Sequence, residues 1–158
     1  MPSVDILARE LAEISRELRR AGDTELVTEL RDAINEAVAP VPREIIDRLP
    51  EYLPNRYARV LASDISIRIS NRSRTGGQTV SITAPERGVR SVERRRLLRL
   101  NRGTLEHPLF GNRRRWYPQA VKPLFFDEPI YDRVPEIRQE IEDALERVKD
   151  KIFQGAHR

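Results

Sequence analysis

The chain has 158 residues, of which 39% are hydrophobic and 34% are charged, and it contains no cysteine. The absence of cysteine excludes a disulfide framework and any metal site built on thiolates. No apolar run comes near the roughly 18 residues that a membrane-spanning helix requires, and the N-terminal sequence lacks the apolar segment of a signal peptide. The length therefore predicts one soluble domain, residues 1–158, with a modest core.

The net charge of +4 conceals a strong asymmetry along the chain. Residues 51–126 hold 16 basic residues against 5 acidic ones, whereas residues 1–50 hold 7 against 11 and residues 127–158 hold 6 against 9. The basic excess of the middle segment is nearly all arginine, a side chain that pairs bidentately with carboxylates and phosphates. This segment predicts either a solvated basic surface or a surface that meets an anionic partner.

The acidic N-terminal segment, 1–50, predicts helices. A first amphipathic helix is expected after Ser3, a possible N-cap, because apolar residues recur at spacings of three and four: Val4, Leu7, Leu11, Ile14 and Leu18. A second helix is expected to start at Asp23 or Thr24 and to end before two prolines. A shorter third helix is expected over 43–49.

The middle segment, 60–126, predicts a small antiparallel sheet. Isoleucines alternate with polar residues over 65–70, which is typical of a half-buried strand. The triplet Thr75-Gly76-Gly77 supplies a turn, and residues 78–84 return as the second strand of a hairpin. A further strand is expected to end near Leu100.

The stretch Arg102–Gln119 concentrates rigid and bulky residues. It holds the only Trp of the chain, one of the two His, two of the seven Gly and two of the eleven Pro. Gly permits backbone conformations that other residues avoid, and Pro restricts its own φ and the residue before it. The composition predicts an ordered functional loop.

The C-terminal segment predicts a short extended piece over 121–126 and then a long helix. The helix is expected over 130–153, beginning near Tyr131 with Asp132 as a possible N-cap, because apolar residues keep heptad-like spacing to its end. The whole chain is thus expected to be an α+β domain: two N-terminal helices, a small antiparallel sheet with a β-hairpin, a long ordered loop and a long C-terminal helix.

A search for catalytic chemistry finds no phosphate-binding loop, no dinucleotide fingerprint and no nucleophile elbow. Asp127, Glu128 and Asp132 could in principle hold a metal, but acidic residues at a helix N-terminus are common because the helix dipole favours them. His107 is better explained as a structural residue in a tight turn than as an acid–base group. We therefore expect a protein that is not an enzyme, with no catalytic residues, no metal and no cofactor.

The mixture of arginine and aromatic residues from Arg94 to Trp116 permits two interpretations. Arginines with Trp and Tyr can combine phosphate contacts with base stacking, which would indicate a small nucleic-acid-binding module. The same residue types are enriched where protein subunits meet. A third and weaker hypothesis is a toxin–antitoxin or chaperone-like partner whose helices bind another protein.

The run from Leu100 to Val121 resembles the hallmark segment of the tail-completion, or minor tail, proteins that join head and tail in long-tailed bacteriophages. The matching residues are Leu100, Arg102, Gly103, His107, Pro108, Phe110, Gly111, Trp116, Gln119 and Val121. The resemblance extends over about 23–152 through the order of elements. Two features differ from the family pattern: Pro123 is followed by Leu124 where the family has a Pro-Gly pair, and the arginine cluster at 113–115 is heavier.

The resemblance implies a structural protein of the virion, assembled in the host cytoplasm. Such proteins form a ring, expected to be a hexamer, between the head connector or stopper and the tail tube or tail terminator, and DNA passes through the ring. The residues expected to contact a neighbouring subunit or partner are Arg102, Gly103, His107, Pro108, Phe110, Gly111, Trp116 and Gln119. Those that could face the lumen or the DNA are Arg72, Arg74, Arg94, Arg95, Arg96, Arg113, Arg114 and Arg115.

Overall fold

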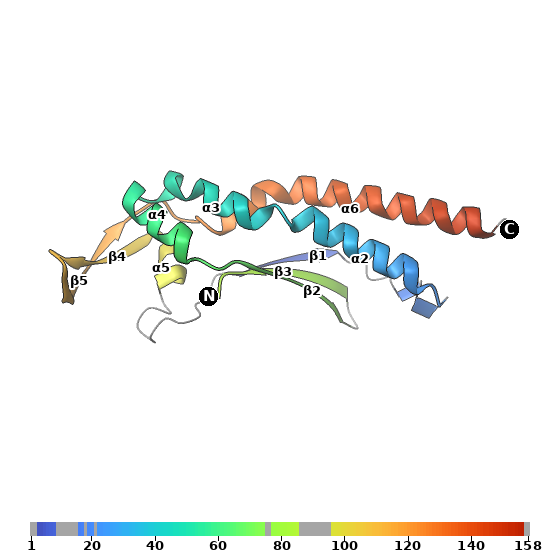
Figure 1. Ribbon diagram of the computed structural model, residues 1–158, viewed down its shortest axis with the longest axis horizontal. Coiled ribbons are helices and arrows are strands. Elements are labelled where there is room, and N and C mark those ends of the chain that lie inside the picture. The colour runs from blue at the N-terminus through green and yellow to red at the C-terminus, as the bar shows by residue number, and fades with distance from the viewer. Residues whose placement is uncertain are drawn as a thin grey trace. The chain divides into compact units, whose positions relative to one another are not determined.

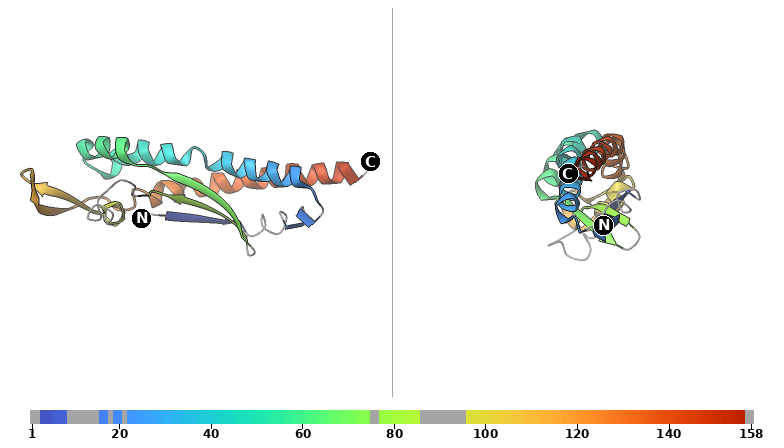
Figure 2. Two further views of the ribbon diagram at one scale, coloured as in Figure 1. Left: turned by 60° about the horizontal axis from the view of Figure 1, so that its bottom comes forward. Right: turned by 90° about the vertical axis from the view of Figure 1, so that its right-hand side faces the viewer.

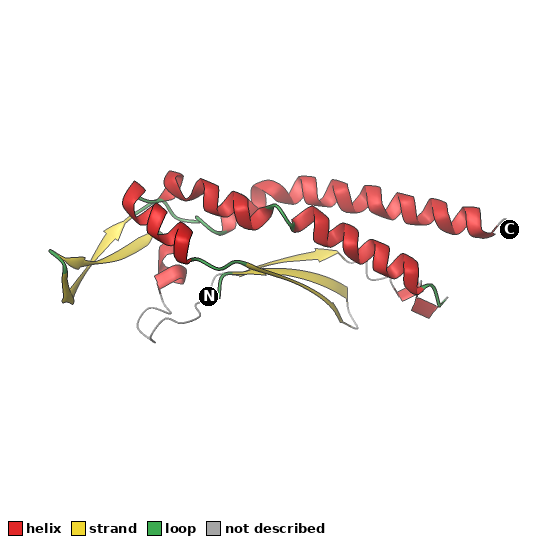
Figure 3. Ribbon diagram, viewed as in Figure 1, coloured by secondary structure: helices red, strands yellow, loops and turns green. Residues whose placement is uncertain are grey.

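A computed structural model describes residues 3–8, 16–17, 19–20, 22–74, 77–85 and 96–156 (Figure 1). The described chain mixes helices with two small antiparallel sheets and closes with a long helix, which confirms the expected α+β class (Figure 3). The helices are α2 (Thr24–Val38), α3 (Val41–Tyr52), α4 (Asn55–Asp64), α5 (Arg96–Asn101) and α6 (Asp127–Ala156). The strands are β1 (Ser3–Ala8), β2 (Arg68–Arg74), β3 (Gly77–Thr83), β4 (Thr104–Leu109) and β5 (Asn112–Ala120).

The chain divides into two compact units, each assembled from three separate segments. The first unit comprises Met1–Val4, Val41–Arg68 and Ile82–Asp132. The second comprises Asp5–Pro40, Ile69–Ser81 and Arg133–Arg158. Because the segments of both units alternate along the sequence, neither unit is a contiguous stretch of chain. The expectation of one domain over 1–158 stays a prediction.

In the second unit, α2 and the body of α6 lie side by side (Figures 1 and 2). The predicted start of α2 is confirmed, since the Asp23 carboxylate accepts a hydrogen bond from the Leu26 amide at 3.1 Å. Leu26 packs with Val148 of α6 in a buried cluster. The Lys151 ammonium group donates to both oxygens of Glu29 at 2.7 Å. The apolar spacing of the two helices thus serves to pack them against each other.

The predicted helix beginning at Val4 is wrong over its first part, because Ser3–Ala8 forms strand β1. This strand lies beside β3 in a three-stranded sheet with the order β1-β3-β2. Pairing with a strand some seventy residues away along the chain overrides the local helical pattern, as tertiary context often does. Residues 9–15, which carry the middle of the predicted helix, lie outside the described residues.

The predicted hairpin is confirmed as β2 and β3, which are neighbours in that sheet. The first strand begins at Arg68, three residues later than the isoleucine pattern suggested. The middle residues of the return strand, Val80 and Ile82, are buried, as their alternation indicated. The turn residues 75–76 lie outside the described part of the chain.

The first unit has a core formed by α3 and the start of α6. Fully buried side chains include Ile45 and Leu49 of α3, Phe125 and Phe126 before α6, and Ile130 within it. The helix predicted over 43–49 extends to Val41–Tyr52, and its inner Pro50 does not end it. Helix α4 follows after Pro54 and was not predicted. Its apolar residues Tyr57, Val60 and Leu61 do recur at helical spacing, so this signal was present in the sequence and was overlooked.

Three other expectations are corrected in the first unit. The strand expected to end near Leu100 is helix α5, held by the burial of Leu100 and Asn101. The expected loop Arg102–Gln119 is mostly the two-stranded hairpin β4–β5. Helix α6 starts at Asp127 rather than near Tyr131, because Pro129 falls in the first turn, where its missing N–H costs no hydrogen bond.

Candidate assembly surface: the β4–β5 hairpin

Strands β4 and β5 form an antiparallel ladder that starts at the base of the hairpin. The partners run from Thr104 opposite Ala120 to Pro108 opposite Trp116. All nine residues of β5 are exposed, whereas β4 has Leu105 buried and its other residues half-buried. Figures 1 and 2 show the tip of the hairpin reaching past helix α4. The hairpin therefore offers one complete strand to solvent.

The tip of the hairpin is a two-residue turn between Leu109 and Asn112, which face each other. Phe110 has φ 49° and Gly111 has φ 77°, the left-handed conformations that both central residues of a type I′ turn require. Such a φ is rare for a bulky residue and costs about 1–2 kcal/mol. Phe110 is 98% exposed, so no packing among the described residues offsets the strain.

The three arginines of β5 bulge out of the ladder. Pro108 faces Trp116 and the next residue, Leu109, faces Asn112, so 113–115 have no partner on β4. The Asn112 side-chain oxygen accepts a hydrogen bond from the Arg114 amide at 3.0 Å, which stabilises the bulge. All three arginines are exposed. The register thus accommodates three consecutive arginines in an unpaired bulge of the hairpin.

Trp116 closes the bulge and carries a cation on its ring. Its indole Nε1 donates a hydrogen bond to the Arg113 carbonyl at 3.0 Å. The Arg96 guanidinium lies 4.1 Å from the ring centroid, within the range of a cation–π interaction. Trp116 remains 40% exposed. Arg96, one of the arginines expected to face DNA, therefore lies against the hairpin itself.

His107 lies within strand β4, so its interpretation as a residue of a tight turn is wrong. Its ring lies between two tyrosines, with centroid distances of 6.3 Å to Tyr57 of α4 and 5.8 Å to Tyr117 of β5. Tilted arrangements at these distances are favourable between aromatic rings. His107 thus packs the base half of the hairpin against α4.

Gly103 connects helix α5 to the hairpin. Its amide donates to the Leu100 carbonyl at 2.9 Å, and its carbonyl accepts from the Val121 amide at 3.0 Å. Its φ of 91° suits the residue after a helix C-terminus, a position that glycine favours. A Cβ here would lie 3.0 Å from the Val121 carbonyl oxygen. The hallmark glycine therefore has a structural role at the base of the hairpin.

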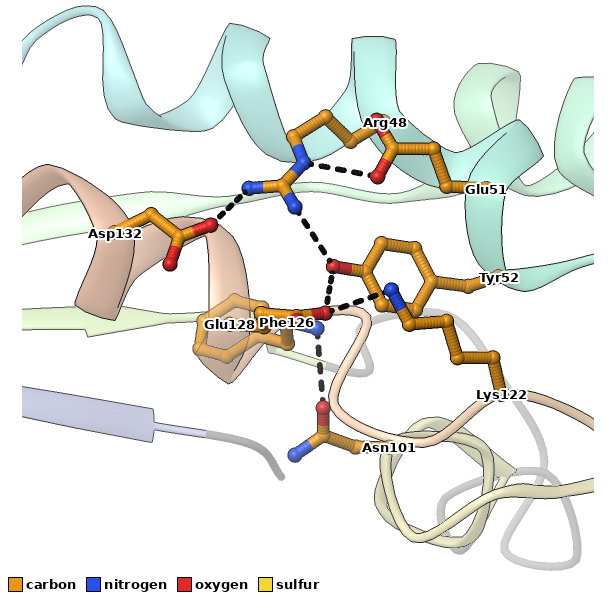
Figure 4. Close-up of polar contacts among 8 residues, drawn as sticks. All are labelled: Arg48, Glu51, Tyr52, Asn101, Lys122, Phe126, Glu128 and Asp132. Atoms are coloured by element: carbon orange, nitrogen blue, oxygen red, sulfur yellow. Dashed lines mark hydrogen bonds and ion pairs between the residues drawn. The ribbon is translucent and has the colours of Figure 1, made fainter.

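Asn101 holds the segment that follows the hairpin. Its side chain is buried, and its Oδ1 accepts a hydrogen bond from the Phe126 amide at 3.0 Å (Figure 4). Its backbone carbonyl accepts from the Leu124 amide at 2.7 Å. These bonds hold Leu124 at φ 68°, the second position where a bulky residue is left-handed. Sequence reasoning missed Asn101, since one Asn between Leu100 and Arg102 carries no recognisable pattern.

A polar network joins α3 to the first turns of α6 (Figure 4). Arg48 donates to Asp132 at 2.7 Å and to the Tyr52 hydroxyl at 3.2 Å. The Tyr52 hydroxyl donates to Glu128, which also pairs with Lys122 at 3.1 Å. Two of the three carboxylates weighed as metal ligands, Glu128 and Asp132, are thus engaged with Arg48, Tyr52 and Lys122. Asp132 serves as an ion-pair partner in mid-helix, and its predicted N-cap role is wrong.

The network predicts a stability that falls on both sides of neutral pH. The hydrogen bond from Tyr52 and then Lys122 lower the pKa of Glu128 from its ordinary 4.5, so its contribution is present above pH 4.5 and is lost as the pH falls through the lowered value. Burial and then Glu128 raise the pKa of Tyr52 above its ordinary 10.0, so its contribution is lost as the pH rises beyond 10. Urea unfolding from pH 3 to 11 measures both flanks.

Tyr52→Phe is the control for this pH profile. The substitution keeps the buried ring and removes the hydroxyl that connects Arg48 with Glu128. We expect unfolding midpoints that decline less at both ends of the pH range. A variant whose profile matches that of the unmodified protein would show that other groups cause the decline.

The remaining predicted residues fall into three groups. Arg102, Gln119 and the hairpin arginines are exposed in the first unit, and Pro108 is half-buried there. Arg72 is exposed on β2 of the second unit, and Arg74 ends that strand. Arg94 and Arg95 lie outside the described residues. The hallmark residues are therefore gathered on one hairpin and its base.

The part of the chain that the structure describes was searched for a metal-binding cluster and for a membrane-spanning helix. There, no group of three or more His, Asp or Glu side chains could hold a metal ion. Likewise, no helix among those residues combines the length and the apolar character of a membrane span. Comparison of the chain with protein-family models, with curated proteins and with solved structures found no match.

Proposed function

We propose that this chain is a structural, non-enzymatic subunit of a bacteriophage neck, forming a ring that joins the head connector to the tail tube and lets DNA pass. One observation carries the proposal: the β4–β5 hairpin exposes all of β5 and ends in a strained, 98% exposed Phe110. A two-stranded hairpin is marginally stable in water by itself. A hairpin built in this way suits an arm that another protein covers on assembly.

The backbone supports the resemblance to tail-completion proteins at three positions. Gly103 and Gly111, both hallmark residues, have φ 91° and 77°. Leu124 has φ 68° and stands where the family carries the glycine of a Pro-Gly pair. Each position thus has the backbone conformation that a glycine adopts without strain. These three backbone conformations are compatible with the family pattern and support the resemblance.

The decisive experiment separates the assembly role of Phe110 from its effect on folding. Phe110→Asn creates Asn-Gly, the preferred pair of a type I′ turn, so the free energy of unfolding should rise by up to about 1 kcal/mol. Joining of purified heads and tails in an extract that lacks the chain should fall at least tenfold. The control is Phe110→Tyr, which keeps an aromatic tip and should retain joining. If the Phe110→Asn variant joins heads and tails normally, the hairpin tip is not an arm that assembly requires.

The exposed arginines favour one alternative, a nucleic-acid-binding module. Replacing residues 113–115 with glutamine would then weaken DNA binding strongly and reduce the log–log salt slope by about 0.9 for each phosphate that the variant no longer neutralises. A neck subunit predicts weak, nonspecific DNA binding and little change in joining. Titration of DNA at several salt concentrations distinguishes the two functions.

A further inference from the structure

A groove in the first unit lies between α4, α5 and β4 and has a volume of about 300 Å³. Its lining is mostly apolar, including Leu53, Leu61, Leu97, Leu100 and Leu105. Val60 stands on its rim and is 55% exposed. A volume at the lower end of the range for ligand sites suits one aromatic side chain rather than an extended ligand.

The rim of this groove carries one carboxylate that can attract a basic partner. Arg99 and Glu106 on the rim pair with each other. Asp64 accepts a hydrogen bond from Ser63 at 3.3 Å and forms no ion pair within the described ranges. Arg96 also lines the groove, but its guanidinium lies over the Trp116 ring of the hairpin. The groove thus combines an apolar floor with two basic and two acidic side chains, of which Asp64 is the carboxylate with no ion pair among the described residues.

The hairpin tip has the complementary character. Phe110 is an apolar projection whose 98% exposure shows that it does not occupy the groove of its own chain. The exposed arginines 113–115 follow it closely in the hairpin. Because the tight turn holds Phe110 in one backbone conformation, little further ordering is required when it binds.

We infer that the hairpin tip of one copy inserts Phe110 into the groove of a second copy, with 113–115 meeting Asp64. This inference rests on the proposed function and names the neighbouring subunit as the partner of the arm. The tip and the groove are different surfaces of one chain, so each copy binds the next head to tail. Such heterologous contacts close into a ring when the rotation between copies permits. The charges supply attraction and register, and the buried ring supplies most of the affinity.

Cysteine crosslinking tests this contact directly, since the chain has no cysteine of its own. A tagged full-length Asn112→Cys chain, which places the thiol beside the tip turn and keeps the Phe110 ring, is mixed with an untagged Val60→Cys chain under mild oxidation. We expect a tagged–untagged dimer at least ten times more abundant than with an untagged Tyr131→Cys chain. Tyr131 is 59% exposed, so the control cysteine is at least as accessible as the one at Val60. Equal yields from the two mixtures would overturn the inference.

A second measurement distinguishes failure of this contact from failure of the neck function. Phe110→Asn and Val60→Glu should each prevent self-association, whereas their mixture keeps one intact tip and one intact groove and should form a one-to-one dimer by mass photometry. Val60→Glu alters an exposed rim position, and its unfolding curve checks its fold. Suppose that Phe110→Asn abolishes head–tail joining but leaves self-association of the chain unchanged. The hairpin tip then binds another neck protein, so the contact between copies is refuted and the proposed neck function is not.

Discussion

Gly103→Ala is expected to lower the free energy of unfolding by about 2–4 kcal/mol. Two costs contribute. The φ of 91° is unfavourable for any residue with a Cβ, and the new methyl group would lie 3.0 Å from the Val121 carbonyl oxygen and 3.3 Å from Pro123 Cβ. Neither neighbour can move easily, since the first is backbone and the second is a rigid ring. Urea unfolding measures the loss.

Gly111→Ala is the matched control for this prediction. Gly111 has a similar φ of 77°, but a Cβ there would have no atom within 4 Å. The control substitution therefore adds backbone strain without a clash, and it should cost about 1–2 kcal/mol. The difference between the two losses of unfolding free energy measures the cost of the contact between the new methyl group at residue 103 and the Val121–Pro123 segment. Equal losses would mean that the Val121 segment can move aside.

Asn101→Ala should cost about 2 kcal/mol, because it leaves the buried Phe126 amide without its acceptor. The bond it removes is the 3.0 Å contact between Asn101 Oδ1 and the Phe126 N–H. Both Asn101 and Phe126 are buried, so water cannot replace the missing acceptor without rearrangement. Thermal and urea unfolding of the variant at neutral pH measure the loss.

Asn112→Ala removes the same kind of bond in an exposed place. Its side-chain oxygen accepts from the Arg114 amide at 3.0 Å, and solvent can take over this role. We expect a loss of no more than about 0.5 kcal/mol. If Asn101→Ala and Asn112→Ala lose equal stability, burial does not make the Asn101 hydrogen bond more stabilising than the exposed one at Asn112.

Local sequence signals predicted the elements whose causes are local. The Asp23 cap and the apolar spacing after it located α2 correctly. The isoleucine alternation and the return strand over 78–84 predicted the β2–β3 hairpin, in which β2 begins three residues later than the alternation. The hallmark stretch was found from its composition, yet its Phe-Gly pair was not interpreted as a hairpin turn. An Asn or Asp before Gly111 would have indicated a type I′ turn. Phe110 is an uncommon residue at that position, so the sequence did not indicate the turn.

The sequence by itself determined the α+β class, helix α2 and the β2–β3 hairpin. Only the tertiary structure decided that Ser3–Ala8 is a strand, because its partner β3 is distant in the chain. Contacts across the first unit likewise made Asn101 a buried acceptor and shaped the groove between α4, α5 and β4. Caps and periodicity act within a few residues, whereas strand pairing, buried hydrogen bonds and grooves depend on segments that only folding brings together.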